Sequence, residues 1–347
     1  MKKALVFILI YCVITALTFW SAVRILYQPF ISVIISVYNY ESYISTTIES
    51  VLKSSLQDFE VIIVNDGSTD NSLYVIQKYA KNNSKITVID QKNQGLSIAR
   101  NNAMKIAKGK YVWFVDADDF IDVSAIEKMK TAILRSKNAT QIEPDIVSFY
   151  IKPVNHIGIP SEEKVGYYSL LPRELMQHQI TPFQGNQIPH YVLPYYPATS
   201  SKQIYRLKYL QDKQIQFIPH LVFEDEVFFA TTLASGAKGI IIPQVLYYKR
   251  SHGASITHNR PRYYDSTVRL PRISYQEIKK IGGSEELARF YFDWHFSGVF
   301  SKWPNQQKFI PILKELLAFI QNQPNDDFWE KHKNRLQSFI LEQEIKQ

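Results

Sequence analysis

Residues 31–66 read ISVIISVYNYESYISTTIESVLKSSLQDFEVIIVND and, with KYVWFVDADD at 110–119, they decide the fold. Short runs rich in β-branched residues are typical of buried strands, and they occupy 31–37, 59–65, 85–90 and 110–116. Apolar residues at helical spacing predict helices between these runs, over 41–56, up to about 80, and over 95–107. Such alternation predicts parallel strands joined by crossover helices.

Polar residues follow three of these strands directly. They are Tyr38 and Asn39 after the first, Asp66 after the second, and Asp116 and Asp118 at the end of the fourth. Because ligands of parallel sheets bind beyond the carboxyl ends of the strands, we expect these groups, distant in sequence, to line one cleft.

The rest of the chain changes character towards its C-terminus. The pattern predicts a helix over 122–137, strands over 145–151 and 239–250, and loops over 153–200. Residues 201–217 read as helix followed by extended chain, and from about 263 the chain is helical. We therefore expect an N-terminal segment (1–29), a central domain (30–260, with halves 30–130 and 131–260) and a helical extension (261–347).

Composition excludes several classes. With 46% hydrophobic and 21% charged residues among 347, the chain is neither collagen-like nor disordered. The single cysteine, Cys12, allows no internal disulfide. The net charge of +8 fits an anionic partner or a lysine-rich surface, but no Lys/Arg block points to nucleic acid.

Residues 4–23, ALVFILIYCVITALTFWSAV, carry no charge. As a helix they would reach roughly 30 Å, enough to cross a bilayer core, so we expect a membrane anchor. A cleaved signal peptide and a buried core helix are the alternatives. Lys2 and Lys3 outweigh Arg24, which by the positive-inside rule retains the N-terminus in the cytoplasm and places the following domain outside.

The motif Asp116-x-Asp118 follows a hydrophobic strand. One or two carboxylates can hold Mg²⁺ or Mn²⁺ together with a substrate diphosphate, although a solvated turn that caps the next helix has the same sequence. Asp66 precedes Gly67, where an acidic acceptor could bind the N–H of a base, or the pair could form a plain turn.

The acidic trio Glu224-Asp225-Glu226 lies in the apolar stretch VFEDEVFF. Burial of a carboxylate raises its pKa and suits it to act as a general base. The alternative is a helix N-terminus, which favours acidic residues through its dipole. No G-x-G-x-x-G or Walker A pattern is present, so dinucleotide oxidoreductases and P-loop NTPases lose their main support.

Taken together, ISVIISVYNYESYISTTIESVLKSSLQDFEVIIVNDGSTDNS, NQGLSIARNNAMKIAKGKYVWFVDADDF, VFEDEVFF and YYKRSHGASIT resemble the family 2 glycosyltransferases of the GT-A fold. The resemblance implies an α/β fold with a Rossmann-like, mostly parallel sheet flanked by helices. It also implies an inverting transferase that uses Mg²⁺ or Mn²⁺ and a nucleotide-sugar donor, most often a UDP-hexose or UDP-N-acetylhexosamine.

The same resemblance implies roles for donor-binding residues. Tyr38 and Asn39 resemble part of the base-binding loop, and Asp66 resembles the carboxylate that reads uracil. Arg100 resembles a nucleotide-contacting arginine, and Asp116 a group near the ribose.

For the chemistry, Asp118 resembles the metal ligand and Asp225 the general base that deprotonates the acceptor hydroxyl. Arg250 and Ser255 lie in the late motif and are expected near the diphosphate or the acceptor.

Two positions depart from the pattern of the family. Ser36 stands where many members have Pro, and Asn65 where many have a first Asp. Both departures loosen the assignment of the base pocket, but neither removes a group that the mechanism requires.

Two other activities are the alternatives to a glycosyltransferase. One is a catalytically silent module that binds nucleotide sugars or glycans on the same fold. The other is a nucleotidyltransferase, an enzyme that usually has a glycine-rich loop after the first strand. The stretch at that place, SVYNYESY, is not glycine-rich and so does not favour this activity. The expected acceptor is a glycan or a lipid-linked glycan of cell-surface polysaccharide or lipopolysaccharide. The expected location is a bacterial inner membrane with the catalytic domain in the cytoplasm, against the charge bias of the N-terminal segment.

Overall fold

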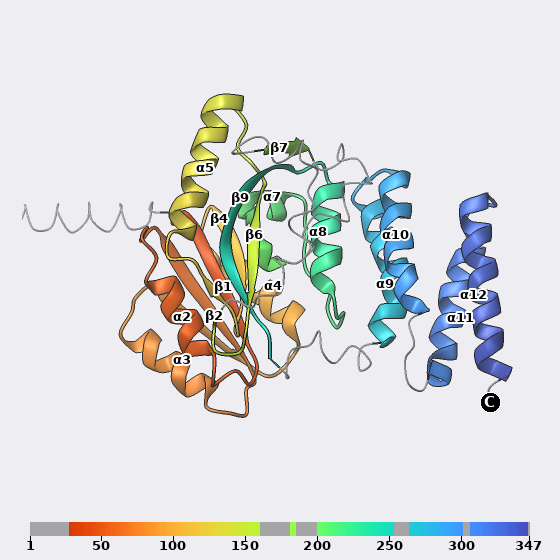
Figure 1. Cartoon of the computed structure of the whole chain (residues 1–347), viewed down its shortest axis with the longest axis horizontal. Coiled ribbons are helices and arrows are strands. Elements are labelled where there is room, and N and C mark those ends of the chain that lie inside the picture. Colours follow the sequence, from red (N-terminus) through yellow and green to blue (C-terminus); the bar gives the residue numbers. More distant parts are fainter. Residues whose placement is uncertain (1–27, 160–180, 185–199, 253–263, 301–305, 346–347) are drawn as a thin grey trace, which may run out of the picture.

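The structure, a computed structural model, describes residues 28–159, 181–184, 200–252, 264–300 and 306–345 (Figure 1). The strands are β1 (Ile31–Val37), β2 (Phe59–Asp66), β3 (Ile86–Gln91), β4 (Tyr111–Asp116), β5 (Phe120–Ile121), β6 (Ile146–Val154), β7 (Thr181–Gln184), β8 (Gln203–Arg206) and β9 (Lys238–Arg250). The helices are α2 (Ile44–Leu52), α3 (Ser72–Lys81), α4 (Leu96–Ile106), α5 (Ala125–Thr140), α7 (Leu207–Asp212), α8 (Glu224–Ala234), α9 (Tyr264–Lys280), α10 (Glu285–Val299), α11 (Ile310–Gln321) and α12 (Asp327–Ile345). Short 3₁₀ turns occupy Ser200–Lys202 and Gln306–Phe309.

The described strands form one sheet in the order β3-β2-β1-β4-β8-β6-β9-β5, with β7 also paired to β9. Strands β3, β2, β1 and β4 are parallel, as the sequence predicts. In the second half β8 runs antiparallel to both β4 and β6, while β6 and β9 are parallel. The α/β class is confirmed, with a sheet whose parallel pairing is concentrated in its first half.

Helices cover both faces of the sheet (Figure 1). Alternate residues of β1 point to opposite faces: Val33 and Ile35 pack with the buried faces of α2 and α5, whereas Ile34 packs on the side of α4. These residues are fully or almost fully buried, which explains why the strand carries β-branched apolar residues on both of its faces.

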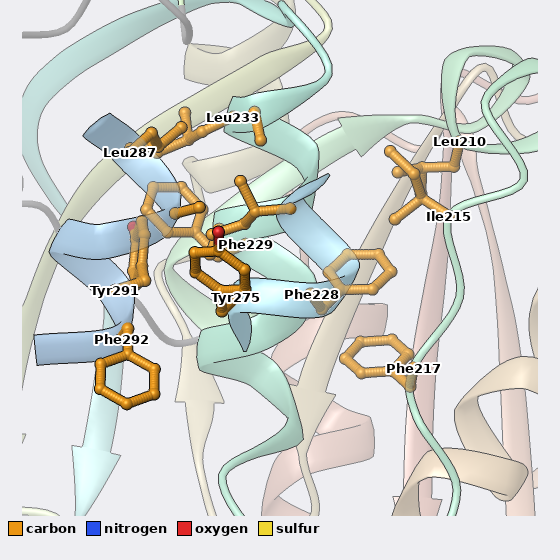
Figure 2. Close-up of a cluster of buried hydrophobic side chains, with 14 of the residues drawn as sticks. Leu210, Ile215, Phe217, Phe228, Phe229, Leu233, Tyr275, Leu287, Tyr291 and Phe292 are labelled. Atoms are coloured by element: carbon orange, nitrogen blue, oxygen red, sulfur yellow. The ribbon is translucent and has the colours of Figure 1, made fainter. Parts of the chain in front are cut away.

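The second face carries an aromatic core that reaches the C-terminal helices (Figure 2). The rings of Phe217 and Phe228 stack with centroids 4.0 Å apart. Phe114 of β4 and Tyr205 of β8 meet Phe228 edge-on. Helix α8 is therefore packed directly against the sheet, and this fixes the position of its N-terminus.

The C-terminal helices pack outward from α8 as α9 and α10, followed by α11 and α12 (Figure 1). Their contact residues belong to the same hydrophobic cluster as the sheet face, among them Tyr275, Phe292 and Trp329. The helical extension expected from 261 onward is thus continuous with the core of the sheet face that carries α8.

One sequence prediction is wrong in its order. Residues 201–217 read as helix before extended chain, but strand β8 (Gln203–Arg206) comes first and helix α7 follows. The strand has only four residues and pairs antiparallel with β4 and β6, so its structure depends on pairings that local periodicity does not contain.

The predicted anchor at 4–23 lies outside the described residues. Within the described ranges, none of the helices combines the length and the apolar character that crossing a bilayer requires.

Substitution of Phe228 by Ala tests the aromatic core. The change removes a buried ring that stacks on Phe217, and we expect the free energy of unfolding to fall by about 3–5 kcal/mol, as measured by urea denaturation. Tyr74→Ala is the control, because Tyr74 is 70% exposed, and it should change stability by less than about 0.5 kcal/mol. Equal effects of the two substitutions would contradict this assignment of the core.

Candidate active site

The loops after β1 and β2 are held together by hydrogen bonds. The backbone N–H of Asn39 donates to the Ser68 hydroxyl (3.1 Å), and Asn39 Oδ1 accepts the N–H of Thr69 (2.7 Å). Asn39 has a φ of +60°, a left-handed conformation that Asn tolerates better than most residues. Tyr38 beside it is 46% exposed, so its ring is available at this rim.

Asp66, at the end of β2, is buried and binds the loop after β3. Its carboxylate accepts the side-chain N–H of Gln91 (2.8 Å) and the backbone N–H groups of Gln94 (2.9 Å) and Gly95 (2.8 Å). Gly67 is required next to it, because its φ is +72° and a Cβ there would lie 2.6 Å from the backbone nitrogen of Asn93. A carboxylate has about four acceptor positions, so Asp66 retains capacity for a further donor.

Arg100 of α4 is buried and connects two distant parts of the chain. Its Nη2 donates to Asp116 Oδ1 (2.8 Å) and its Nη1 to Glu224 Oε1 (2.7 Å). The guanidinium also lies over the ring of Phe217, 5.1 Å from the centroid. Arg100 thereby holds the N-terminus of α8 against the end of β4.

The acidic loop after β4 is clamped from strand β9. Tyr247 accepts the N–H of Asp116 (3.1 Å) and donates to Asp119 Oδ2 (2.6 Å). The backbone N–H of Arg250 donates to Asp119 Oδ1 (2.6 Å), and its Nε donates to the carbonyl of Asp118 (2.7 Å). Burial raises the pKa of Asp119 well above its usual range, and the Asp118 charge adds to this.

Asp118 lies beside a histidine that holds a defined position. Asp118 Oδ2 is 2.8 Å from His252 Nε2. The imidazole stacks on Tyr43 with centroids 4.7 Å apart and meets Tyr40 edge-on. Burial raises the pKa of Asp118, and the charge of Asp116 raises it further.

The acidic trio begins helix α8, so the helix N-terminus interpretation is confirmed, while the general-base role of Asp225 stays a prediction. Asp225 is half-buried, and burial together with the Glu226 charge raises its pKa to about 6. The preceding Phe223 has a φ of +66°, a strained conformation for an aromatic residue of the kind found at functional sites.

The predicted carboxylates meet at one rim. Asp66 ends β2 and Asp116 ends β4, and both strands flank β1 in parallel register. Asp118 follows in the same loop, and Arg100 brings the helix that carries Asp225 to Asp116.

Two other residues, Arg250 and Ser255, are expected near the diphosphate or the acceptor. The Arg250 side chain donates to the carbonyls of Asp118 (2.7 Å) and His156 (2.7 Å), so it supports the acidic loop. Ser255 lies outside the described residues. The roles suggested for the site residues by resemblance stay predictions.

Sequence reasoning missed several members of the site. Glu224, and not only Asp225, is engaged there, through Arg100. His252 stands in the quoted motif YYKRSH and could have been singled out as a residue two positions after Arg250. Lys202 is buried close to Asp225, and burial with the nearby Lys249 charge lowers its pKa to about 7; nothing local in SKQIYR indicates this.

The described residues include no cluster of three or more His, Cys, Asp or Glu that could hold a metal. Asp118 and His252 nevertheless offer one carboxylate and one imidazole side by side. Such a pair leaves coordination positions for water and diphosphate oxygens, and its donor set fits a divalent cation such as Mn²⁺.

Residues 32–189 match the family described as Glycosyl transferase family 2. This part of the chain is similar to glycosyl transferase family 2. The sequence predicts a glycosyltransferase. The matching family and the similar proteins are named glycosyltransferases, which supports this enzyme class.

Among similar proteins, the uncharacterized glycosyltransferase EpsJ of Bacillus subtilis is 32% identical over 207 residues, 58% of this chain and 53% of that protein. Poly(ribitol-phosphate) beta-glucosyltransferase of Bacillus spizizenii is 37% identical over 135 residues, 38% of this chain and 20% of that protein. The matches therefore span about half of EpsJ and a smaller share of the glucosyltransferase.

Solved structures share the fold. Staphylococcus aureus TarS 1–349 in complex with UDP-GlcNAc superposes with a TM-score of 0.63 at 22% identity, covering 83% of this chain and 80% of that one. The mannosyltransferase PcManGT of Pyrobaculum calidifontis, in complex with GDP-Man and Mn²⁺, gives 0.51 at 16% identity, covering 95% and 93%. Both support a GT-A-like architecture for this chain.

Replacement of Arg100 by Leu tests the central ion pairs. The change leaves Glu224 buried without its cation, and we expect a loss of about 3–5 kcal/mol in the free energy of unfolding, measured by urea denaturation. Lys53→Leu is the control, because Lys53 pairs with Glu49 at the surface, where ion pairs contribute about 0–1 kcal/mol. A loss in Arg100→Leu as small as that of the control would contradict this assignment.

Proposed function

We propose that this protein transfers a sugar from a nucleotide-sugar donor to a hydroxyl group of a glycan or lipid-linked acceptor. The observation that carries the proposal is that Arg100 connects the acidic loop to the start of α8: it binds Asp116 at the end of β4 and Glu224, the residue before Asp225. The structural neighbours support a sugar donor of this class, since TarS is in complex with UDP-GlcNAc and PcManGT with GDP-Man.

The donor base is proposed to lie between the loops after β1, β2 and β3. Asp66 is fixed there with spare acceptor capacity, which suits an N–H of uracil, and Tyr38 is exposed for stacking. The donor is accordingly a UDP-hexose or UDP-N-acetylhexosamine.

The proposed metal is Mg²⁺ or Mn²⁺, held by Asp118 and His252. When bound, the cation offsets the negative charge that develops on the departing diphosphate. The raised pKa of Asp118 is consistent with this role, because burial and the nearby Asp116 charge disfavour its ionised form until a cation is present.

The proposed general base is Asp225. With a pKa of about 6 its carboxylate is mostly ionised at neutral pH and accepts the proton of the acceptor hydroxyl as that oxygen attacks the anomeric carbon. A single base without a covalent nucleophile leads to inversion at that carbon, as in inverting glycosidases.

The proposed setting is the synthesis of a cell-surface polysaccharide, in keeping with relatives named chondroitin synthase and poly(ribitol-phosphate) beta-glucosyltransferase. Attachment to the inner membrane through residues 4–23, with the catalytic domain in the cytoplasm, belongs to the same proposal. A silent module that binds nucleotide sugars is the alternative, and turnover decides between the two.

Asp225→Asn tests the base. We expect kcat for release of nucleoside diphosphate to fall by about 10²- to 10⁴-fold with little change in donor KM, because the amide cannot accept the proton. In the wild type, kcat/KM should decline as pH falls through about 6, since protonation removes the base. Asp212→Asn, at the exposed end of α7, should retain full activity; full activity of Asp225→Asn would refute the assignment.

Asp118→Ala tests the metal. We expect calorimetric binding of UDP in the presence of Mn²⁺ to weaken by about 100-fold or more, beyond the roughly 10- to 100-fold that outer-shell changes cause. Metal-free binding of UDP should change little, because the base pocket is intact. Unchanged Mn²⁺ dependence would exclude Asp118 as a ligand.

A further inference from the structure

One buried imidazole joins three helices beside the candidate base. His295 belongs to α10 and is almost fully buried. Its Nε2 lies 2.8 Å from Glu226 Oε2 on α8, and its Nδ1 lies 3.0 Å from the Ser274 hydroxyl on α9. Glu226 follows Asp225 directly in the first turn of α8.

The hydrogen bonds of His295 indicate which of its ring nitrogens donates to Glu226. A carboxylate can only accept, so His295 Nε2 carries a proton and donates it to Glu226. Ser274 Oγ fixes the other ring nitrogen and lies 2.8 Å from the carbonyl of Leu270 in its own helix. Because both ring nitrogens are engaged, rotation of the imidazole would break both bonds at once.

We infer that His295 is a positioning residue for the transfer site, which holds Glu226 in place beside Asp225 and so couples helices α9 and α10 to the candidate base. This inference rests on the proposed function. It assigns to the C-terminal helices a part in the transfer reaction besides packing.

The coupling has an electrostatic consequence for Asp225. The Glu226 charge is the second-largest cause, after burial, of its raised pKa. The N–H of His295 is hydrogen-bonded to the Glu226 carboxylate and offsets part of its charge, so loss of His295 should raise the pKa of Asp225 further. Loss of the Glu226 charge should lower it.

Other charged or titratable groups also surround this pair. Glu226 is faced by Lys202, before β8, and by Tyr291 of α10. The groups that face Asp225 are Arg100, Asp116, Lys202, Tyr205, Glu224 and Lys249. The test therefore compares variants at His295 and Glu226 only and leaves these surroundings unchanged.

The experiment is a double-mutant cycle in the full chain with two readouts. Carboxyl ¹³C NMR on protein labelled at aspartate, with the Asp225 signal assigned by its loss in Asp225→Asn, gives the pKa of Asp225 without any need for activity. Release of nucleoside diphosphate from a UDP-sugar gives kcat and donor KM. Thermal denaturation shows that each variant is folded.

For His295→Leu we expect an upward shift of the Asp225 pKa by about half a unit or more and a fall in kcat of about tenfold or more, at unchanged donor KM. Glu226→Gln should lower the same pKa, and in that background His295→Leu should cause no further shift. His295→Gln keeps an N–H donor and should retain kcat within about threefold of wild type. If the Leu variant does not fold, the Gln variant and Glu226→Gln carry the comparison.

The inference is overturned if substitution of His295 leaves both the pKa of Asp225 and kcat unchanged. It is also overturned if the shift is the same with and without Glu226. A wild-type protein that turns over no donor, yet shows the coupled titration, would refute the transferase proposal and leave the coupling of His295 to Asp225 intact.

Discussion

The candidate site depends on a buried guanidinium that binds two carboxylates from opposite halves of the chain. Arg100 sits on α4 and joins Asp116, at the end of β4, to Glu224, at the start of α8. Burying a charge is costly unless it is paired and hydrogen-bonded, so this contact has few alternative geometries. It sets the distance between the loop proposed to hold the metal and the helix proposed to supply the base.

Around this contact the protein gathers more negative charge than its own cations neutralise locally. Burial keeps the pKa values of Asp118, Asp119 and Asp225 above their usual range. A site of this kind favours a divalent cation and disfavours full ionisation in its absence. Burial, together with the Glu226 charge, raises the pKa of Asp225 to about 6, which suits general-base catalysis.

The first half of the fold could be predicted from sequence because its information is local. Buried parallel strands read as hydrophobic runs, and the turns after them carry Asp66 and Asp118 where ligands of such sheets bind. Strand β8 could not be predicted in this way, because its four residues are held by β4 and β6. Local sequence also does not distinguish Glu224, which binds Arg100, from Glu226, which binds His295, since these partners come from distant helices. His252 becomes part of the site through its contact with Asp118 and its stacking on Tyr43, residues that are both distant from it in sequence.

A crystal structure of the full chain with UDP and Mn²⁺, with the metal located by its anomalous scattering, tests the central claim most directly. The account predicts an anomalous peak bound by Asp118 and His252, a diphosphate on that ion, and the uracil beside Asp66. A diphosphate and metal bound away from the acidic loop, with Asp225 facing no part of the nucleotide cleft, would contradict it.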